Sequence, residues 1–128
     1  MWGAAVIDGR IEMRRGETPE VLAALQAGAA NGDIESMLAW AKIMARSPET
    51  VATAEALWRS AAERGSVEAW FRLGLLLVRR GDIDEGEMWL RKGAEQGDME
   101  AIAALASLLE SRGDDAEARH WFSFIVDR

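Results

Sequence analysis

The sequence predicts an all-α fold, a right-handed α-solenoid of about three helix-turn-helix repeats preceded by an N-terminal half repeat. Apolar residues recur at intervals of three and four rather than two, which is typical of amphipathic helices. Alanine is abundant and the 128 residues include only two prolines, a composition that favours helix. A short pattern built on glycine also returns at a fixed interval, which indicates stacked repeats.

The repeated pattern begins at Gly32, Gly65 and Gly97, which are 33 and 32 residues apart. The three segments read NGDIESMLAWAKIM, RGSVEAWFRLGLLL and QGDMEAIAALASLL. An Asp or Ser, both good N-caps, follows each glycine, and a Glu then lies in the first turn, where the helix dipole favours a carboxylate. Each segment therefore predicts the first helix of a pair.

The second helix of each unit is expected to begin at a capping residue: Thr18-Pro19, Ser47-Pro48, Asp82 or Asp114. The first two starts place Pro at the first helical position, where its missing N–H costs nothing. The last two are close to the capping box, with a Glu three residues further on. Seven helices are therefore expected, at residues 19–30, 34–46, 48–64, 67–80, 83–96, 99–112 and 115–126.

The tripeptide Arg-Gly-Asp occurs twice, at residues 80–82 and 112–114. Cell-surface adhesion receptors recognise this tripeptide, but both copies fall at the same point of the repeat. In each copy the Arg ends a helix, where the dipole favours a cation, the Gly supplies a left-handed residue and the Asp caps the next helix. We therefore interpret both tripeptides as turns.

The first 17 residues do not follow the repeat, so the predicted domains are an N-terminal segment at 1–17 and a repeat domain at 18–128. Asp8 and Gly9 stand between two apolar stretches, which is a hairpin signal. An isolated hairpin is only marginally stable. The segment is therefore expected either to pack as a cap or to form an arm, and the sequence leaves both open.

The second repeat reads Trp70-x-x-Leu73-Gly74-x-x-Leu77 and resembles the tetratricopeptide pattern. The endings AAERG and GAEQGD are similar to those of Sel1-like repeats, a related family whose units finish in A-A-E-Q-G. The loop between paired helices is shorter than in that family, so the chain from Thr18 onward resembles a divergent member. The resemblance implies an α-superhelix whose first helices line a concave groove for a peptide or partner helix, and it implies no catalysis.

Composition argues against an enzyme and against a binder of nucleic acids or membrane surfaces. The formal net charge is −7, whereas phosphate backbones and anionic lipids attract clustered Lys and Arg. Cysteine is absent and His120 is the single histidine, so the chain offers neither a thiolate metal site nor a histidine cluster. We find no phosphate loop and no nucleophile with its base, and we expect no cofactor, no metal and no catalysis.

The longest apolar run, LGLLLV at residues 73–78, is far shorter than the roughly 20 residues of a membrane-spanning helix. Asp8 interrupts the stretch that would be apolar in a signal peptide. We therefore expect a cytoplasmic protein. The preference for Arg over Lys and the abundant Ala favour a bacterial source.

The tryptophans of the second helices, Trp58, Trp89 and Trp121, fall on the stripe that is expected to face the core. We prefer this interpretation to a platform for stacking bases because basic neighbours are lacking.

The predicted binding groove consists of side chains that lie one turn around from the core on the first helices. These are Leu38, Lys42, Phe71, Arg72, Leu75, Ala103, Ser107 and Glu110. Its middle is apolar, and burying an exposed Phe or Leu is worth roughly 1.5–3 kcal/mol. The main hypothesis is an adaptor or regulatory subunit that binds a peptide or helix of a partner protein there. Alternatively, neighbouring repeats or the N-terminal segment cover these side chains.

The last predicted helix departs from its predecessors. Phe124 and Ile125 stand where the earlier second helices carry small or polar residues. Together with Trp121 they predict either a repacked cap or a sticky surface. The alternative function is therefore a structural homo-oligomer, such as a homodimer, assembled through this apolar face.

Overall fold

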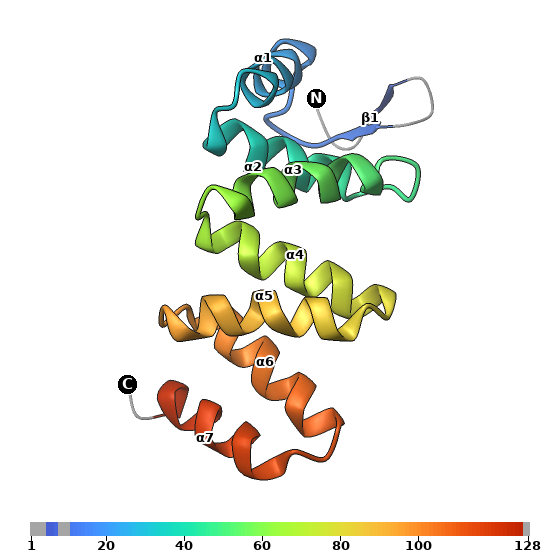
Figure 1. Ribbon diagram of the computed structural model, residues 1–128. Coiled ribbons are helices and arrows are strands. Elements are labelled where there is room, and N and C mark those ends of the chain that lie inside the picture. Colours follow the sequence, from blue (N-terminus) through green and yellow to red (C-terminus); the bar gives the residue numbers. More distant parts are fainter. Residues whose placement is uncertain (1–4, 8–10, 127–128) are drawn as a thin grey trace. The chain divides into compact units, whose positions relative to one another are not determined.

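The computed structural model describes residues 5–7 and 11–126, with side chains from residue 14 onward. Within these residues it contains two short strands and seven helices (Figure 1). Their bounds are β1 (Ala5–Ile7), β2 (Ile11–Met13), α1 (Pro19–Ala30), α2 (Ile34–Met44), α3 (Val51–Glu63), α4 (Val67–Arg80), α5 (Ile83–Glu95), α6 (Met99–Ser111) and α7 (Asp115–Val126). The seven predicted helices are all present, and the all-α class is confirmed.

The chain divides into two compact units, residues 1–64 and 65–128. Unit 1 contains β1, β2 and α1 to α3, and unit 2 contains α4 to α7. Unit 2 consists of two successive helical pairs, α4 with α5 and α6 with α7, and α5 also packs against α6. The predicted division at residue 17 stays a prediction.

Four helices begin at the capping residues that the sequence predicts. Asp33, Ser66 and Asp98 each accept a hydrogen bond from the backbone N–H three residues further on, at 3.0, 3.2 and 2.9 Å. Thr18 does the same at 3.1 Å, and Pro19 occupies the first turn of α1. These caps satisfy N–H groups that a helix leaves without a partner.

The start of α3 differs from the prediction, because the helix begins at Val51 rather than at residue 48. The Thr50 N–H bonds to the Ser47 carbonyl at 3.1 Å, which closes a turn between α2 and α3. The Thr50 hydroxyl donates to the Met44 carbonyl at 2.5 Å and so satisfies the end of α2. Pro48 therefore lies inside this turn instead of at the first helical position.

The two Arg-Gly-Asp tripeptides are turns, as predicted. Gly81 and Gly113 have φ of 102° and 85°, the left-handed region that glycine tolerates. Asp82 differs in one respect, since it stands at the N-cap of α5 without a side-chain cap bond. Its carboxylate instead accepts from Arg80 Nε at 2.9 Å. With ψ of 68°, Asp82 lacks the extended backbone that turns Asp33 and Asp98 towards their helices.

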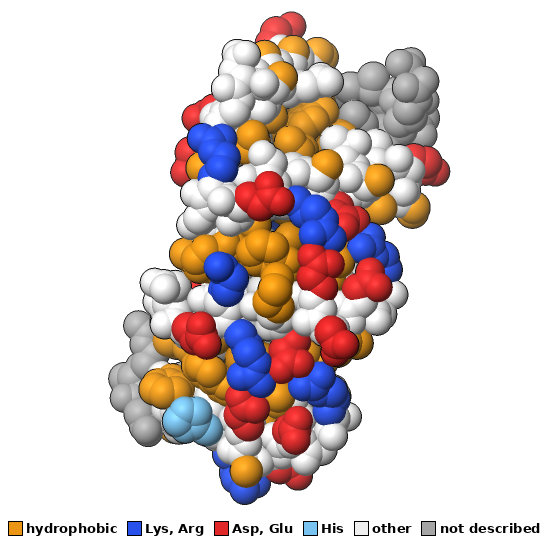
Figure 2. Space-filling model, in the orientation of Figure 1, with side chains coloured by type: hydrophobic (Ala, Val, Ile, Leu, Met, Phe, Trp, Pro, Cys, Tyr) orange, Lys and Arg blue, Asp and Glu red, His pale blue; other side chains and the backbone are white. Residues whose placement is uncertain are grey.

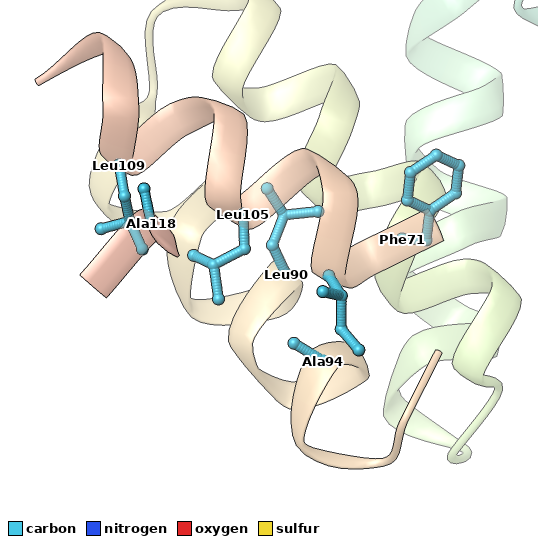
Figure 3. Packing of buried hydrophobic residues seen from close by; sticks show 7 residues of the cluster. Phe71, Leu90, Ala94, Leu105, Leu109 and Ala118 are labelled. Carbon is cyan, nitrogen blue, oxygen red and sulfur yellow. The ribbon is translucent and has the colours of Figure 1, made fainter. Parts of the chain in front are cut away.

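The core of unit 2 is one continuous cluster to which all four helices contribute. It consists of Phe71, Leu90, Ala94, Ile102, Leu105, Leu109 and Ala118. The labelled side chains form a row, with Phe71 at one end and Leu109 and Ala118 at the other (Figure 3). Leu75, Phe122 and Ile125 pack at the edge of this row.

Small residues let α4 and α5 approach each other closely. A Cβ added at Gly86 would lie 2.6 Å from Val78 Cγ2 and 2.9 Å from the Gly74 carbonyl oxygen. A Cβ added at Gly74 would lie 2.9 Å from Leu90 Cγ. The two glycines therefore stand where backbone meets backbone, and no larger residue fits there without movement.

In unit 1, β1 and β2 pair antiparallel, with Val6 opposite Glu12, while the predicted turn at residues 8 and 9 lies outside the described part of the chain. The segment that follows β2 is attached by an ion pair. Arg46 donates from both terminal nitrogens to the Glu17 carboxylate, at 2.9 and 2.6 Å. These bonds hold the pKa of Glu17 at about 2 and attach residues 14–17 to the end of α2.

We expect Gly86→Ala to lower the free energy of unfolding by about 1–3 kcal/mol, because the added methyl group collides with Val78 and with the Gly74 carbonyl. Helix propensity alone predicts the opposite sign, a gain of about 1 kcal/mol. Urea denaturation followed by circular dichroism measures the difference. Met88→Ala, an exposed change in the same helix, is the control. Unchanged or increased stability of Gly86→Ala would contradict the close approach.

A second prediction concerns the pH dependence of the stabilisation that the Glu17–Arg46 pair provides. We expect Glu17→Gln to cost about 1–2 kcal/mol near neutral pH, as for other charged hydrogen bonds. The folded pKa of Glu17, about 2, lies below its usual 4.5, so this stabilisation is complete above 4.5 and is lost as the pH falls towards 2. The difference between wild type and variant, measured by denaturation across this range, should therefore shrink with acidification. A constant difference would show that the charge of Glu17 does not matter.

Candidate functional site

The eight residues of the predicted groove lie on three helices. Leu38 and Lys42 belong to α2 in unit 1, and the other six belong to α4 and α6 in unit 2. Helices α4 and α6 lie against each other within unit 2. We call Arg72, Leu75, Ala103, Ser107 and Glu110 the α4/α6 surface.

Two of the three large apolar residues expected at the groove surface are buried. Leu38 is 7% exposed and Phe71 is 8% exposed, and Phe71 belongs to the core cluster of unit 2 together with Ile102. The expectation treated each first helix alone, whereas α6 packs close enough to α4 to cover Phe71. Leu75 is half-buried and is the remaining large apolar side chain of the α4/α6 surface. Changing Phe71 to Glu would place a charge in the core and is therefore no test of binding.

The rest of the α4/α6 surface is small or polar. The Arg72 guanidinium lies 5.5 Å from the centre of the Phe71 ring, and its Nε is 3.8 Å from Glu68 Oε2. Ala103 is half-buried, whereas Ser107 and Glu110 are exposed. The surface thus offers one aliphatic contact surrounded by polar groups. The groove as a binding site stays a prediction.

A second surface of unit 2 is formed by a short motif that occurs in both second helices. In α5, Trp89 Nε1 donates to Glu85 Oε2 at 3.2 Å, and in α7, Trp121 Nε1 donates to Glu117 Oε2 at 3.2 Å. Each pair is four residues apart on its helix, so the two side chains share a face. The hydrogen bond fixes the orientation of each indole.

Trp89 differs from the expected core position, since it is half-buried and lies outside the core cluster. Helix α5 faces α4 and α6 through Gly86, Leu90 and Ala94, which are buried. One residue step rotates a side chain by about 100° around a helix, so Trp89 lies on the flank of this buried stripe. Trp121 is also half-buried and packs partly against the core.

Around Trp89 the motif continues with a cation between two aromatic rings. Lys92 Nζ lies 5.0 Å from the ring centre of Trp70, on α4, and 5.9 Å from that of Trp89. Cation–π contacts at exposed sites contribute about 0.5–1 kcal/mol each. Met88 is next to this group and is 47% exposed.

Around Trp121 the corresponding positions carry rings. His120, Trp121 and Phe124 contact one another with ring centres 5.2 to 5.8 Å apart. Of the residues predicted for self-association, Phe124 is 44% exposed, while Trp121 and Ile125 are half-buried. Val126 is 79% exposed. The end of α7 thus presents apolar side chains to solvent.

The two motifs are joined by ion pairs centred on Arg91. Arg91 donates to Glu117 Oε2 at 2.6 Å and to Glu87 Oε2 at 2.9 Å. Arg112, at the end of α6, lies 2.8 Å from Glu87 Oε1. Hydrogen bonds from Arg91 and then Trp121 lower the pKa of the Glu117 carboxyl, and the bond to Glu117 raises the pKa of Arg91. The network ties α5 to α7 and to the end of α6.

We call this second surface the aromatic face. It consists of Trp70, Met88, Trp89, Lys92, His120, Trp121 and Phe124. Figure 2 shows hydrophobic side chains over unit 2 interleaved with Lys, Arg and His side chains and with Asp and Glu side chains on the visible face. This surface was not predicted from the sequence, because the core stripe was expected to hold Trp89 and Trp121. The signal was present as Glu-x-x-x-Trp, repeated 32 residues apart at Trp89 and Trp121.

The described residues contain no group of three His, Cys, Asp or Glu side chains that is arranged to hold a metal ion. His120 lies edge-on against its aromatic neighbours. In the described part of the chain, every helix is too short or too polar to cross a membrane.

We expect the Arg91–Glu117 pair to stabilise the fold by a coupling of about 0.5–1 kcal/mol, as for other partly exposed pairs. A double-mutant cycle with Arg91→Met and Glu117→Gln, followed by urea denaturation, measures this coupling. The value should fall as salt is raised from about 0.1 to 1 M, because salt screens partly exposed charges. Independent effects of the two changes at low salt would mean that the pair does not hold α5 to α7.

Comparison with known proteins bears on the fold. No family model and no curated protein matches the sequence. Among solved structures, the chain is similar to a protective antigen present in uropathogenic Escherichia coli strains that displays an SLR (Sel1-like repeat) fold. The similarity has a TM-score of 0.74 at 24% identity, and it covers 87% of this chain and 26% of that one. This chain therefore spans about a quarter of the antigen's length. The predicted resemblance and the all-α solenoid class are confirmed: the chain has the Sel1-like repeat fold.

Proposed function

We propose that the chain is a non-catalytic protein-interaction module, an adaptor or regulatory subunit that binds a peptide or helix of a partner protein. One observation carries the proposal: partly exposed apolar side chains follow the regular helices of unit 2, on α4 at Leu75, on α5 at Met88 and on α7 at Phe124. Stacked repeats present such side chains at regular spacing on extended surfaces. Partners recognise exposed apolar patches of this kind.

The α4/α6 surface is the part of the predicted groove that lies in unit 2 and is not buried, and we propose it as the place where the partner binds. Burying the rest of a half-buried Leu contributes less than about 1.5 kcal/mol, whereas micromolar binding needs about 8 kcal/mol. Leu75 alone is therefore too little. We infer that a partner on this surface adds polar contacts with Arg72, Ser107 and Glu110, which lie around Leu75.

A structural homo-oligomer assembled through α7 is the second candidate. The exposure of Phe124 and Val126, 44% and 79%, favours it. Phe124 contacts the Trp121 ring on the same face of α7, with ring centres 5.6 Å apart, and this pair would form the centre of a small contact between copies.

We expect a partner captured from a cell lysate by the wild-type protein to be lost with Leu75→Glu, because a charge would replace the one aliphatic contact of the α4/α6 surface. Ser107→Arg is a second variant, since it blocks the same surface without entering the core. Val21→Glu, an exposed change on α1, is the matched control. Mass spectrometry of the captured proteins is the measurement, with circular dichroism to check the fold. Equal capture by all four proteins would exclude the α4/α6 surface.

A further inference from the structure

The aromatic face holds two of the four large apolar side chains that the described residues expose, Met88 and Phe124. Along α5, Met88 is one turn before the exposed Lys92. Along α7, the exposed His120 is one turn before Phe124. Each helix thus presents one apolar side chain and one nitrogen-bearing side chain, Lys92 or His120, beside its tryptophan. The Arg91–Glu117 ion pair joins the two helices, and we call these side chains together the strip.

The two indoles of this strip are ordered before any ligand arrives. Glu85 and Glu117 hold the indoles of Trp89 and Trp121 through hydrogen bonds of 3.2 Å. Arg91 holds α5 to α7 through its bond to Glu117. A surface whose side chains are already ordered loses little conformational entropy on binding, so more of its contact energy appears as affinity.

The Lys92 ammonium favours a partner that places a carboxylate opposite it. Three carboxylates beside the tryptophans are engaged: Glu85 by Trp89, Glu117 by Arg91 and Trp121, and Glu87 by Arg91 and Arg112. Asp84 and Glu95, also on α5, are exposed. The described contacts of the Lys92 ammonium are with the rings of Trp70 and Trp89, and no carboxylate of the described residues pairs with it. An exposed ammonium between apolar groups is complementary to a carboxylate that has apolar neighbours of its own.

We propose that the aromatic face binds an acidic amphipathic helix of a partner protein. Apolar side chains of that helix rest on Met88 and Trp89 of α5 and on Trp121 and Phe124 of α7, and one of its carboxylates pairs with Lys92. Helices α5 and α7 are close enough for a single Arg–Glu pair to join them. Two to three helical turns, about 11–16 Å long, therefore reach both.

The proposal rests on the proposed function only in treating the chain as an interaction module, because the aromatic face and the α4/α6 surface share no residue. The formal net charge of −7 does not oppose it at physiological salt. Charges farther away than about 10 Å are screened at 0.1 M salt, whereas the Lys92 pair forms at contact. At lower salt the preference of the aromatic face for an acidic helix should weaken, because the distant negative charges of the chain then repel that helix as well.

The test uses two synthetic helical peptides with leucine along one stripe, flanked in one peptide by glutamate and in the other by lysine. Titration into the full chain is followed by tryptophan fluorescence and by calorimetry at about 0.1 M salt. We expect saturable binding of the glutamate peptide, with a change in tryptophan emission, and binding of the lysine peptide at least about tenfold weaker. Equal binding of both peptides, or no binding of either, would overturn the proposal.

Variants locate the binding. Lys92→Glu should lower the affinity for the glutamate peptide by about tenfold, and Phe124→Ala should lower it by a similar factor. Arg79→Glu, an exposed change on α4 with the same effect on net charge, should leave its affinity unchanged. Circular dichroism shows whether each variant keeps its helices. If Lys92→Glu and Arg79→Glu weaken binding equally, the effect is one of net charge and the assignment of Lys92 is wrong.

Two further measurements distinguish this proposal from binding at the α4/α6 surface and from self-association. Leu75→Glu should not alter binding of the glutamate peptide, so a loss there would place the peptide on the α4/α6 surface and overturn the assignment. Sedimentation of the wild type and of Phe124→Glu tests a second copy as the occupant. A wild-type dimer that Phe124→Glu converts to a monomer would assign the α7 part of the aromatic face to self-association and would also overturn the proposal.

Discussion

The close approach of neighbouring helices in unit 2 is the constraint on which the rest of its structure depends. Gly74 and Gly86 bring the backbones of α4 and α5 together, and a Cβ at Gly93 would lie 2.8 Å from the Cβ of Ala101 on α6. At these distances no larger side chain fits between the helices. The hydrophobic energy of the unit therefore comes from the residues beside the contacts, such as Leu90 and Leu105, which are almost fully buried.

The same constraint explains why aromatic side chains lie on the surface of unit 2. Because α4 and α5 contact each other through glycines, the space between the two helices is too small for an indole. Trp89 is displaced to the flank, where its ring remains half in solvent and its N–H finds Glu85. Tryptophan suits such a position because its ring is apolar and its N–H requires an acceptor. The half-exposure of Trp89 thus accompanies tight packing in the core, and the ion pairs around Arg91 join α5 to α7.

Features that depend on local sequence could be predicted, and features that depend on the spacing between helices could not. Caps such as Asp33 and the glycine turn at Gly81 follow from residues within one turn of the helix end, so the helices were located closely. The start of α3 was misplaced because the Thr50 hydroxyl satisfies the Met44 carbonyl, a contact that the motif Ser-Pro does not contain. The exposure of Phe71 was misjudged for a similar reason, since its burial depends on the distance between α4 and α6.

The packing constraint also limits what α7 is able to contact. Ile125 stands at the position that Gly93 holds in α5, where even a methyl group would lie 2.8 Å from Ala101 of the next helix. A helix therefore cannot pack on α7 at the spacing at which α6 packs on α5. Whatever contacts α7 must lie farther from its backbone and must contact side chains such as Phe124 and Val126, which are exposed. Wider spacing and large apolar contacts are typical of association between separate helices rather than of stacking within this repeat. The departure of α7 from the repeat thus restricts any helix that packs on it to contacts with these side chains.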